Sequence, residues 1–321
     1  MGFVKSVVKI VKKNKRNILI FLIAIFCLIL TGCGKEKSDS KYTIISTSFP
    51  GYDFARAIVK ESDVEVKMLL SPGSETHSYE PTPQDIIDIS NCDIFIYIGG
   101  ESDSWIEDVL DDIDKDKTKI IKLMDLVDVV EEEYIDGMEK DKNDEIELDE
   151  HVWTSPVNAM KIVNKLKDEI ISIDQDNSDL YEENANSYIS EINSIDLQIK
   201  DIVSNSKRKE LVFGDRFPIR YFTDLYGITY YAAFKGCSEQ SEASAKTITF
   251  LIDKVKSNEI PVVLKIELSN GGIANAIAEE TNTKVLEFHS AHNITQKDFD
   301  NGITYVDIMK RNIEVLKEAL N

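Results

Sequence analysis

The 321-residue sequence has little of what several protein classes require. It contains four cysteines, seven prolines, two tryptophans and four histidines, and its 58 acidic residues outnumber its 37 Lys and Arg residues. The formal net charge is −21. A chain this acidic is repelled by a polyanion, so we exclude nucleic acid as a partner. The acidity is compatible with attraction of a cation but does not by itself establish it.

The cysteines are too few and too widely spaced for a zinc ribbon or a redox motif. Cys27 and Cys33 lie in the N-terminal segment, which leaves Cys92 and Cys237 for the rest of the chain. We expect these two residues to be buried free thiols, with a long-range disulfide as the alternative.

Common hydrolase motifs are also missing from the sequence. It contains no His-Glu-x-x-His helix, no Gly-x-Ser-x-Gly elbow and no Gly-rich phosphate loop. We therefore predict that the chain is not an enzyme. A metallohydrolase is the alternative, because zinc with an open coordination position makes a hydrolytic site.

The N-terminal segment has the pattern of a secretion signal. Basic residues precede an apolar run over 18–30, which is too short to span a bilayer comfortably, and Leu30-Thr31-Gly32-Cys33 follows it. The tetrapeptide resembles a bacterial lipobox. We predict a signal peptide over 1–32, lipid attachment at Cys33 and a tether over 33–40, with an uncleaved membrane anchor as the alternative. Loss of the six positive charges of 1–32 takes the net charge to −27.

Short β-branched runs alternate with helical patterns in both halves of the chain. The runs cover 42–46, 64–70, 93–98 and 119–123, and then 210–213, 228–233, 261–266 and 284–288. This alternation favours parallel sheets flanked by helices. We predict an α/β fold with two lobes over 41–155 and 207–321, each with a parallel sheet flanked by helices.

The segment between the predicted lobes, 156–206, has helical patterns. Ser155-Pro156 is typical of a helix start. Apolar residues then recur at spacings of four and three along one stripe: Tyr181, Ala185, Tyr188, Ile192, Ile195, Ile199 and Ile202. The stripe predicts a long, rigid spine helix of about seven turns that joins the lobes and limits clamshell closure.

The segment 130–150 is strongly acidic. Its charge and low hydrophobicity predict a solvated, mobile surface loop. Weak gathering of cations near a site is the functional alternative.

All four histidines fall in loops or at strand ends. His77 follows the run over 64–70, and His289 and His292 follow the run over 284–288. Asp215 and Glu267 follow two other strand-like runs. Ligands of parallel α/β sheets bind beyond the carboxyl ends of the strands, so we expect candidates from both lobes to face one crevice. Imidazole and carboxylate ligands together suit zinc, manganese or iron.

Each of the first two histidines has a flank that favours a ligand role. Gly73 and the Thr82-Pro83 helix start bracket His77, whose alternative reading is a lone surface histidine. His151 is followed two residues later by Trp153, whose ring could shield a site from water. The alternative for His151 is a histidine packed between the lobes.

The most specific segments are Pro72-Gly73 with His77-Ser-Tyr-Glu-Pro-Thr-Pro-Gln-Asp85, and Glu150-His151-Val-Trp153 with Ser155-Pro156. With these segments the chain resembles the metal-binding lipoproteins of bacterial zinc and manganese ABC importers, the cluster 9 or zinc-uptake solute-binding family. The resemblance implies two lobes joined by the spine helix, a metal bound between them, and delivery of that metal to an ABC transporter permease. It also implies a lipid-anchored extracytoplasmic location, and we expect a monomer.

By this resemblance, His77 and His151 take the first two ligand positions. Relatives usually have histidine or glutamate at the third, shortly before an aromatic residue and a Tyr-Phe pair, whereas this chain has Asp215 and Arg216 there. Arg216 cannot bind a cation, so Asp215 is the predicted substitute. The fourth position matches His292, with His289 as its alternate.

Glu267 matches a recurrent family glutamate. We expect it to form hydrogen bonds with the ligand residues and not to bind the metal itself. The predicted set of His77, His151, Asp215 and His292 favours Zn²⁺, with Mn²⁺ as the alternative, because imidazole is a softer ligand than carboxylate. A surface adhesin is the alternative from a different functional class.

Overall fold

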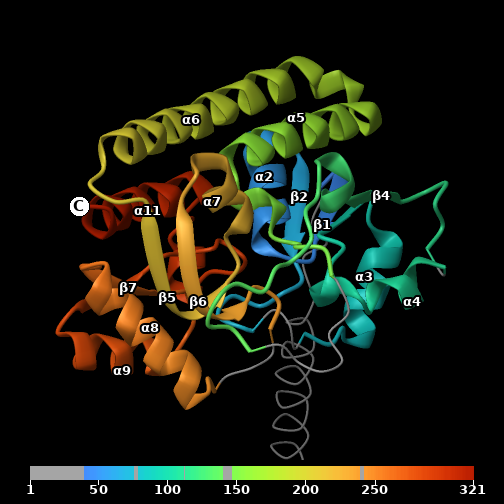
Figure 1. Cartoon of the computed structure of the whole chain (residues 1–321). Helices are drawn as coiled ribbons and strands as arrows, with labels where there is room; N and C mark the ends of the chain where they lie inside the picture. The colour runs from blue at the N-terminus through green and yellow to red at the C-terminus, as the bar shows by residue number, and fades with distance from the viewer. Residues whose placement is uncertain (1–39, 76–78, 112, 140–146, 239–241) are drawn as a thin grey trace, which may run out of the picture. The chain divides into compact units, whose positions relative to one another are not determined.

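The computed structural model describes residues 40–75, 79–111, 113–139, 147–238 and 242–321 (Figure 1). The predicted signal peptide over 1–32, the predicted lipid attachment at Cys33 and the predicted ligand His77 lie outside these ranges. Within the described ranges, no helix is both long enough and apolar enough to cross a membrane.

The first four strands form one parallel sheet. They are β1 (Tyr42–Ser46), β2 (Val64–Met68), β3 (Ile94–Tyr97) and β4 (Lys119–Lys122), in the order β2-β1-β3-β4. Helices α2 (Phe49–Ile58), α3 (Pro83–Asn91) and α4 (Ile106–Leu110) connect them. Successive side chains point to opposite faces, so Ile44 and Ile45 are buried in two different clusters. We call this sheet with its helices the N-terminal lobe.

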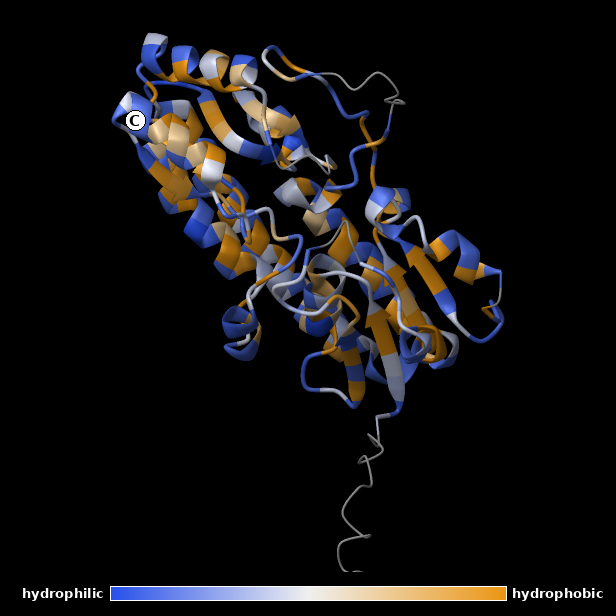
Figure 2. Ribbon diagram, turned by 90° about the horizontal axis from the view of Figure 1, so that it is seen from below, coloured by the Kyte–Doolittle hydropathy of each residue, from blue (hydrophilic) through white to orange (hydrophobic). Residues whose placement is uncertain are grey.

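The last four strands form a second parallel sheet, the C-terminal lobe. They are β5 (Glu210–Phe217), β6 (Thr229–Lys235), β7 (Val262–Lys265) and β8 (Lys284–Glu287), in the order β6-β5-β7-β8. Its helices are α7 (Arg220–Tyr226), α8 (Ala245–Ser257), α9 (Gly272–Thr281), α10 (Gln296–Asp300) and α11 (Tyr305–Ala319). Apolar residues dominate the strands in Figure 2, as expected for sheets covered on both faces.

The two parallel sheets confirm the predicted two-lobe α/β fold, and every strand-like run in the sequence overlaps an observed strand. The predicted helix starts are also correct. The Ser155 side chain accepts a hydrogen bond from the backbone N–H of Asn158 and begins α5 (Pro156–Ile173). Thr82 and Asp85 form a reciprocal capping box that begins α3.

The predicted spine is α6 (Ser178–Asn205), a helix of 28 residues that lies beside α5 across the top of Figure 1. Its buried stripe runs from Tyr181 through Ile192 to Ile199, as the spacing predicts. At the C-terminal end Val203 is buried, and Ile202 is only partly buried.

One apolar core runs through both lobes. The cluster that contains Ile44 and Ile96 of the first sheet also contains Phe213 and Leu264 of the second, and Ile192 of α6 belongs to it. Because packed interiors resist deformation, a shared core favours a fixed relation between the lobes. The arrangement agrees with the stiff connection expected from the sequence.

A buried carboxylate reinforces this connection. Asp53 of α2 accepts hydrogen bonds from the hydroxyl of Tyr188 in α6 and from the backbone N–H of Tyr305 at the start of α11, the latter at 2.9 Å. Burial raises the pKa of this carboxyl, and its hydrogen bonds and the Arg56 guanidinium oppose the shift. Asp53 thus joins helices from both lobes and from the spine.

The acidic segment is largely docked on the protein. Residues 130–139 and 147–149, which we call the acidic strap, form an antiparallel bridge between Glu131 and Leu148. The Lys235 ammonium lies 2.9 Å from the Glu147 carboxylate and 3.4 Å from that of Glu132, whose side chain is 5% exposed. The strap lies at the surface with Glu131, Glu133 and Asp136 exposed, as predicted, but the Glu132 side chain is buried beside Lys235, a counter-charge that composition alone does not locate. Residues 140–146 lie outside the described residues.

The two remaining cysteines are free and buried, as predicted. Burial raises the pKa of Cys92 to about 12 and the pKa of Cys237 well above its usual value. Both thiols therefore stay protonated and act as packing groups.

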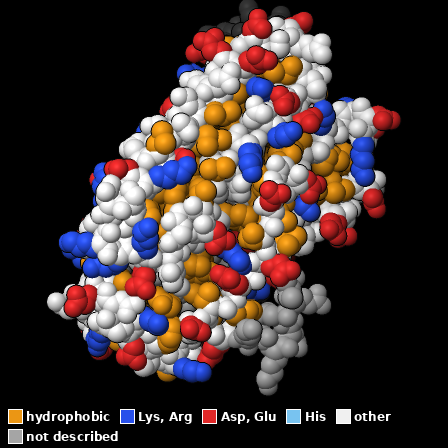
Figure 3. Space-filling view, turned by 45° about the horizontal axis from the view of Figure 1, so that its top comes forward, with side chains coloured by type: hydrophobic (Ala, Val, Ile, Leu, Met, Phe, Trp, Pro, Cys, Tyr) orange, Lys and Arg blue, Asp and Glu red, His pale blue; other side chains and the backbone are white. Residues whose placement is uncertain are grey.

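The surface charge is mixed on the face drawn in Figure 3. Lys and Arg side chains are interspersed there with Asp and Glu side chains and with apolar atoms. The net negative charge of the chain is thus not gathered into a single acidic field on this face.

Candidate metal centre

Two of the predicted ligands meet between the lobes. His151 precedes the short helix η3 (Val152–Thr154), and His292 lies in the loop between β8 and α10. Both side chains are buried, and their ring centroids are 5.1 Å apart with the rings nearly perpendicular. His292 lies beyond the carboxyl end of β8, where ligands of parallel sheets bind.

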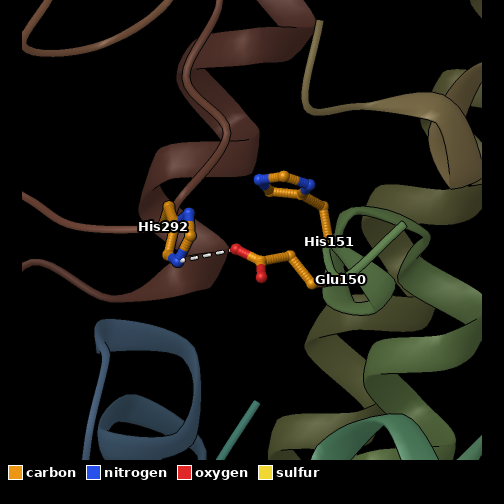
Figure 4. Close-up of side chains that lie close together, drawn as sticks. All are labelled: Glu150, His151 and His292. Carbon is orange, nitrogen blue, oxygen red and sulfur yellow. Dashed lines mark ion pairs between the residues drawn. The ribbon is translucent and has the colours of Figure 1, made fainter. Parts of the chain in front are cut away.

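Glu150 completes a group of three with these histidines (Figure 4). Glu150, His151 and His292 each offer one donor atom, and these atoms all lie within 4.8 Å of one another. The Glu150 Oε1 atom is 3.9 Å from the Nε2 atom of His292. Two imidazoles and a carboxylate are donors that suit a divalent transition metal, and zinc in particular.

Asp149 fixes the orientation of the His151 ring. Its Oδ1 atom lies 3.0 Å from Nδ1 of His151 and accepts a hydrogen bond from the His151 backbone N–H at 2.8 Å. An ionised carboxylate can only accept, so Nδ1 donates and the neutral ring carries its lone pair on Nε2. Burial opposes a charge on this ring, but the Asp149 hydrogen bond and charge, together with the charges of Glu150 and Glu132, outweigh burial and raise the pKa of His151.

Tyr221 of α7 holds Asp149 in turn. Its hydroxyl donates to the backbone carbonyl of Asp149 at 2.7 Å and accepts from the backbone N–H of Val130 at 3.1 Å. Tyr221 of the C-terminal lobe thereby contacts both ends of the acidic strap. The second of these ends, Asp149, lies two residues before His151.

Glu267 supports the loop that carries His292. Its carboxylate accepts hydrogen bonds from the backbone N–H of Ser290 at 2.7 Å and of His292 at 3.2 Å. Between these residues Ala291 has a φ of +62°, a left-handed conformation that a non-glycine residue adopts at a cost. Glu267 therefore stabilises a strained turn that positions His292.

Trp153 packs against both histidines. Its ring centroid is 5.5 Å from that of His151 and 5.0 Å from that of His292, and its indole N–H donates to the carbonyl of Ser290 at 2.8 Å. The fully buried ring excludes water from one side of the group.

His289 makes other contacts. Its Nδ1 atom accepts a hydrogen bond from the backbone N–H of Ala291 at 2.9 Å, and its backbone N–H donates to the Asn312 side chain at 2.9 Å. A nitrogen that accepts this bond has no lone pair left for a metal. Among the described residues, His289 is not in the group of three.

Asp215 is also outside the group of three formed by described residues. The sequence places the end of its strand at Phe213, but β5 continues to Phe217, with a shift in pairing register between Phe213 and Arg216. The Asp215 carboxylate accepts from the backbone N–H groups of Arg216 at 2.9 Å and Ile266 at 3.4 Å. Arg216, not Asp215, lines the cleft that contains His151 and His292.

Sequence reasoning did not assign a role to Glu150. Its carboxylate is fully buried and accepts hydrogen bonds from the backbone N–H of Ser102, at 3.0 Å, and from the Ser102 hydroxyl. A Cβ atom at Gly100 would collide with this carboxylate. Burial raises the pKa of Glu150. The available signal was its position, directly before His151 and an apolar Val-Trp pair that marks a buried segment.

Two imidazoles and a carboxylate that converge between two α/β lobes are the arrangement expected of a solute-binding protein for a divalent metal. Comparison with known proteins leads to the same class. The family model described as zinc-uptake complex component A, periplasmic, matches residues 44–319. The chain belongs to this family.

Its relatives include named zinc-binding proteins. The chain is 30% identical over 308 residues to the zinc-binding lipoprotein AdcA of Streptococcus pneumoniae (strain ATCC BAA-255 / R6), over 95% of this chain and 61% of AdcA. It is 28% identical over 311 residues to the high-affinity zinc uptake system protein ZnuA of Bacillus subtilis (strain 168), over 94% of this chain and 97% of that protein. The chain thus matches less than two thirds of the length of AdcA.

The fold has a solved counterpart. The crystal structure of the Zn(II)-bound ZnuA-like domain of S. pneumoniae AdcA matches with a TM-score of 0.73 and 28% identity. The match covers 87% of this chain and 99% of that domain.

Proposed function

We propose that this chain captures zinc outside the cytoplasm and delivers it to an ABC permease in the membrane, as a binding protein and not as an enzyme. The observation that carries this proposal is the convergence of Glu150, His151 and His292, whose donor atoms lie within 4.8 Å of one another. A buried carboxylate is costly unless a cation or hydrogen bonds compensate its charge. A divalent metal would provide that compensation.

The proposed ligands are His77, His151 and His292 with one carboxylate. The sequence predicts Asp215 as that carboxylate, but the geometry supports Glu150, because Glu150 and not Asp215 offers an oxygen within 4.8 Å of the donor atoms of His151 and His292. A set with three imidazoles favours zinc over manganese. The names of two relatives, a zinc-binding lipoprotein and a zinc uptake system protein, support the same choice.

The surrounding residues prepare these ligands. Asp149 keeps the lone pair of His151 on Nε2, and Glu267 holds the turn before His292. Such partners raise ligand basicity and fix ring orientation, and they are a large part of the affinity of a metal site. The shared core of the lobes favours release through small local shifts, and not through a wide clamshell opening.

We also propose that the mature chain begins at a lipidated Cys33 and acts as a monomer. The sequence pattern around Cys33 supports the anchor, and the name of the AdcA relative, a lipoprotein, agrees with it. Anchoring keeps the carrier near a permease in the same membrane and raises their effective concentration.

Metal titrations on the full chain in detergent test the binding step. We expect tight, stoichiometric zinc binding and weaker manganese binding by competition with a chromogenic chelator. His151→Ala and His292→Ala each remove an imidazole ligand and should weaken zinc binding by more than about 100-fold. Absence of zinc binding by the unaltered chain would refute the proposal.

A matched pair of variants identifies the carboxylate. Glu150→Gln should weaken zinc binding by at least about tenfold, whereas Asp215→Asn should leave it nearly unchanged. Glu318→Gln, which alters a surface ion pair with Lys284, is the control for the Glu→Gln change. The reverse ranking of Glu150 and Asp215 would return the ligand role to Asp215.

A further inference from the structure

Arg216 forms an ion pair between the lobes at the metal cleft. Its Nη1 and Nη2 atoms each lie 3.1 Å from a different carboxylate oxygen of Glu75. Arg216 belongs to β5 of the C-terminal lobe, and Glu75 follows β2 of the N-terminal lobe. Both residues line the cleft that also contains His151 and His292. Bidentate ion pairs between an Arg guanidinium and a carboxylate have a fixed geometry and are stronger than ion pairs with one hydrogen bond.

The loop that carries Glu75 has a second attachment to the C-terminal lobe, formed by hydrogen bonds. The Asn293 side chain donates to the backbone carbonyls of Ser71, at 3.0 Å, and Ser74, at 2.8 Å. The backbone N–H of Gly73 donates to the carbonyl of Ile294 at 2.7 Å. We call residues 71–75 the clasp loop. It is held on one side by the residues that follow His292 and on the other by Arg216.

The two attachments differ in their access to water. Asn293 is almost fully buried. In contrast, the Arg216 and Glu75 side chains are 18% and 46% exposed. Water and salt can therefore compete for the ion pair, which makes it the attachment that opens more readily.

A guanidinium at this place needs an explanation, because a fixed positive charge beside a cation site repels the cation. Glu75 neutralises that charge while the pair is closed. When the pair opens, Glu75 no longer neutralises the charge that Arg216 presents to the cleft. The pair thus couples the position of the clasp loop to the electrostatics of the cleft.

We infer that Arg216 and Glu75 form a charge-paired clasp across the metal cleft, and that opening of this clasp sets how fast the metal enters and leaves. The inference rests on the proposed function, since it assigns the cleft a metal as its cargo. Arg216 and Glu75 act as positioning residues for the clasp loop, and neither residue is a ligand.

Stopped-flow zinc exchange on the full chain tests the clasp. Glu75→Gln and Arg216→Gln should each accelerate zinc exchange. Release should rise more than association in Glu75→Gln, and association more than release in Arg216→Gln, with the larger change in each variant about fivefold, which is the range of a partly exposed ion pair. Their affinities should move in opposite directions. Glu75→Gln leaves an unpaired cation at the cleft and weakens binding, whereas Arg216→Gln removes that cation and strengthens it.

Two further variants separate the clasp from general loosening. The exchanged pair Glu75→Arg with Arg216→Glu should restore slow exchange, and the double Gln variant should exchange no faster than either single variant. Added salt should accelerate exchange in the unaltered chain but not in Glu75→Gln. Glu318→Gln serves as the control. If both single variants still bind zinc and their zinc exchange rates equal those of the unaltered chain, the inference of a clasp is refuted and the proposed function remains.

Hydrogen exchange at the Gly73 amide gives a readout that needs no metal. In the metal-free chain, both single variants should increase exchange of this amide, and the exchanged pair should return it to the level of the unaltered chain. If the unaltered chain bound no zinc, the proposed function would fail, but this measurement would still test the clasp. Unchanged protection of Gly73 in all variants would refute it.

Discussion

The carboxylate of Asp149 lies 3.0 Å from Nδ1 of His151, two residues further along the chain. Asp149 is itself anchored by Tyr221 of the C-terminal lobe. The orientation of a candidate ligand on the N-terminal side of the spine is therefore set by a residue from the other lobe.

Asp149→Asn should weaken zinc binding by about 10- to 100-fold without removing a ligand, because the amide holds the ring less strongly and does not raise its basicity. Chelator competition measures the dissociation constant. Asp176→Asn, at a side chain that is 92% exposed, is the matched control. An affinity within about twofold of the unaltered chain would mean that Asp149 does not act on the metal through His151.

Asp103→Asn should stabilise the metal-free protein at pH 8. Burial, together with the nearby Glu150 charge, raises the pKa of Asp103 to about 7, from an ordinary value of 3.8. The folded state thus binds this proton more tightly than the unfolded state. Its contribution to stability is present at low pH and is lost as the pH rises from about 4 through about 7.

The replacement suits the site. The N–H groups of Ile98 and Gly99 and the Thr47 hydroxyl all donate to one oxygen, Oδ2, which the Asn oxygen can replace. We expect a gain of about 1–3 kcal/mol at pH 8 and a flatter dependence of Tm on pH between 5 and 8. Asp116→Asn, on an exposed turn, is the control. An equally steep pH dependence in Asp103→Asn would contradict the assignment.

The shared core predicts that both lobes unfold together. Ile192→Ala in α6 should lower the unfolding free energy by about 2–5 kcal/mol, because it opens a cavity in a fully buried position. Hydrogen exchange of amides in β1 and β7 should then accelerate to the same extent. Leu197→Ala, at a 57% exposed position of the same helix, should have little effect. Acceleration confined to one sheet would show that the lobes unfold independently.

The acidic strap should depend on Lys235. Lys235→Met leaves the Glu132 carboxylate buried without its counter-charge, and we expect a loss of about 3–5 kcal/mol in stability. Proteolysis within 130–149 should become faster. The double variant with Glu132→Gln should recover most of the loss, because the uncompensated charge is then gone. A double variant as unstable as the single one would mean that Lys235 acts by packing alone.

Much of this architecture could be read from the sequence, for a local physical reason. Strands such as β1 and β3 are short β-branched runs between turns, and α6 carries an apolar stripe at helical spacing. Both signals depend on neighbouring residues only. The strand pattern also placed the four histidines in loops and at strand ends, and the family resemblance singled out His151 and His292 among them.

The choice of carboxylate could not be read in this way. Asp215 and Arg216 are adjacent on β5, where successive side chains point in opposite directions. A single irregularity of register decides which of them faces the cleft. The burial of Glu150 could not be predicted either. Its neighbours in sequence do not reveal that Ser102 and Gly100, about 50 positions away, pack around its carboxylate.

The sequence by itself determined the two-lobed α/β plan, the spine helix and the imidazoles that meet at the centre. The tertiary structure decided that Glu150 joins them, that Asp215 stays outside, and that Arg216 pairs with Glu75 across the cleft. Patterns of period two or 3.6 are local and survive in a linear sequence. Contacts between residues about 50 or 140 positions apart depend on how the sheets pack, which no local pattern records.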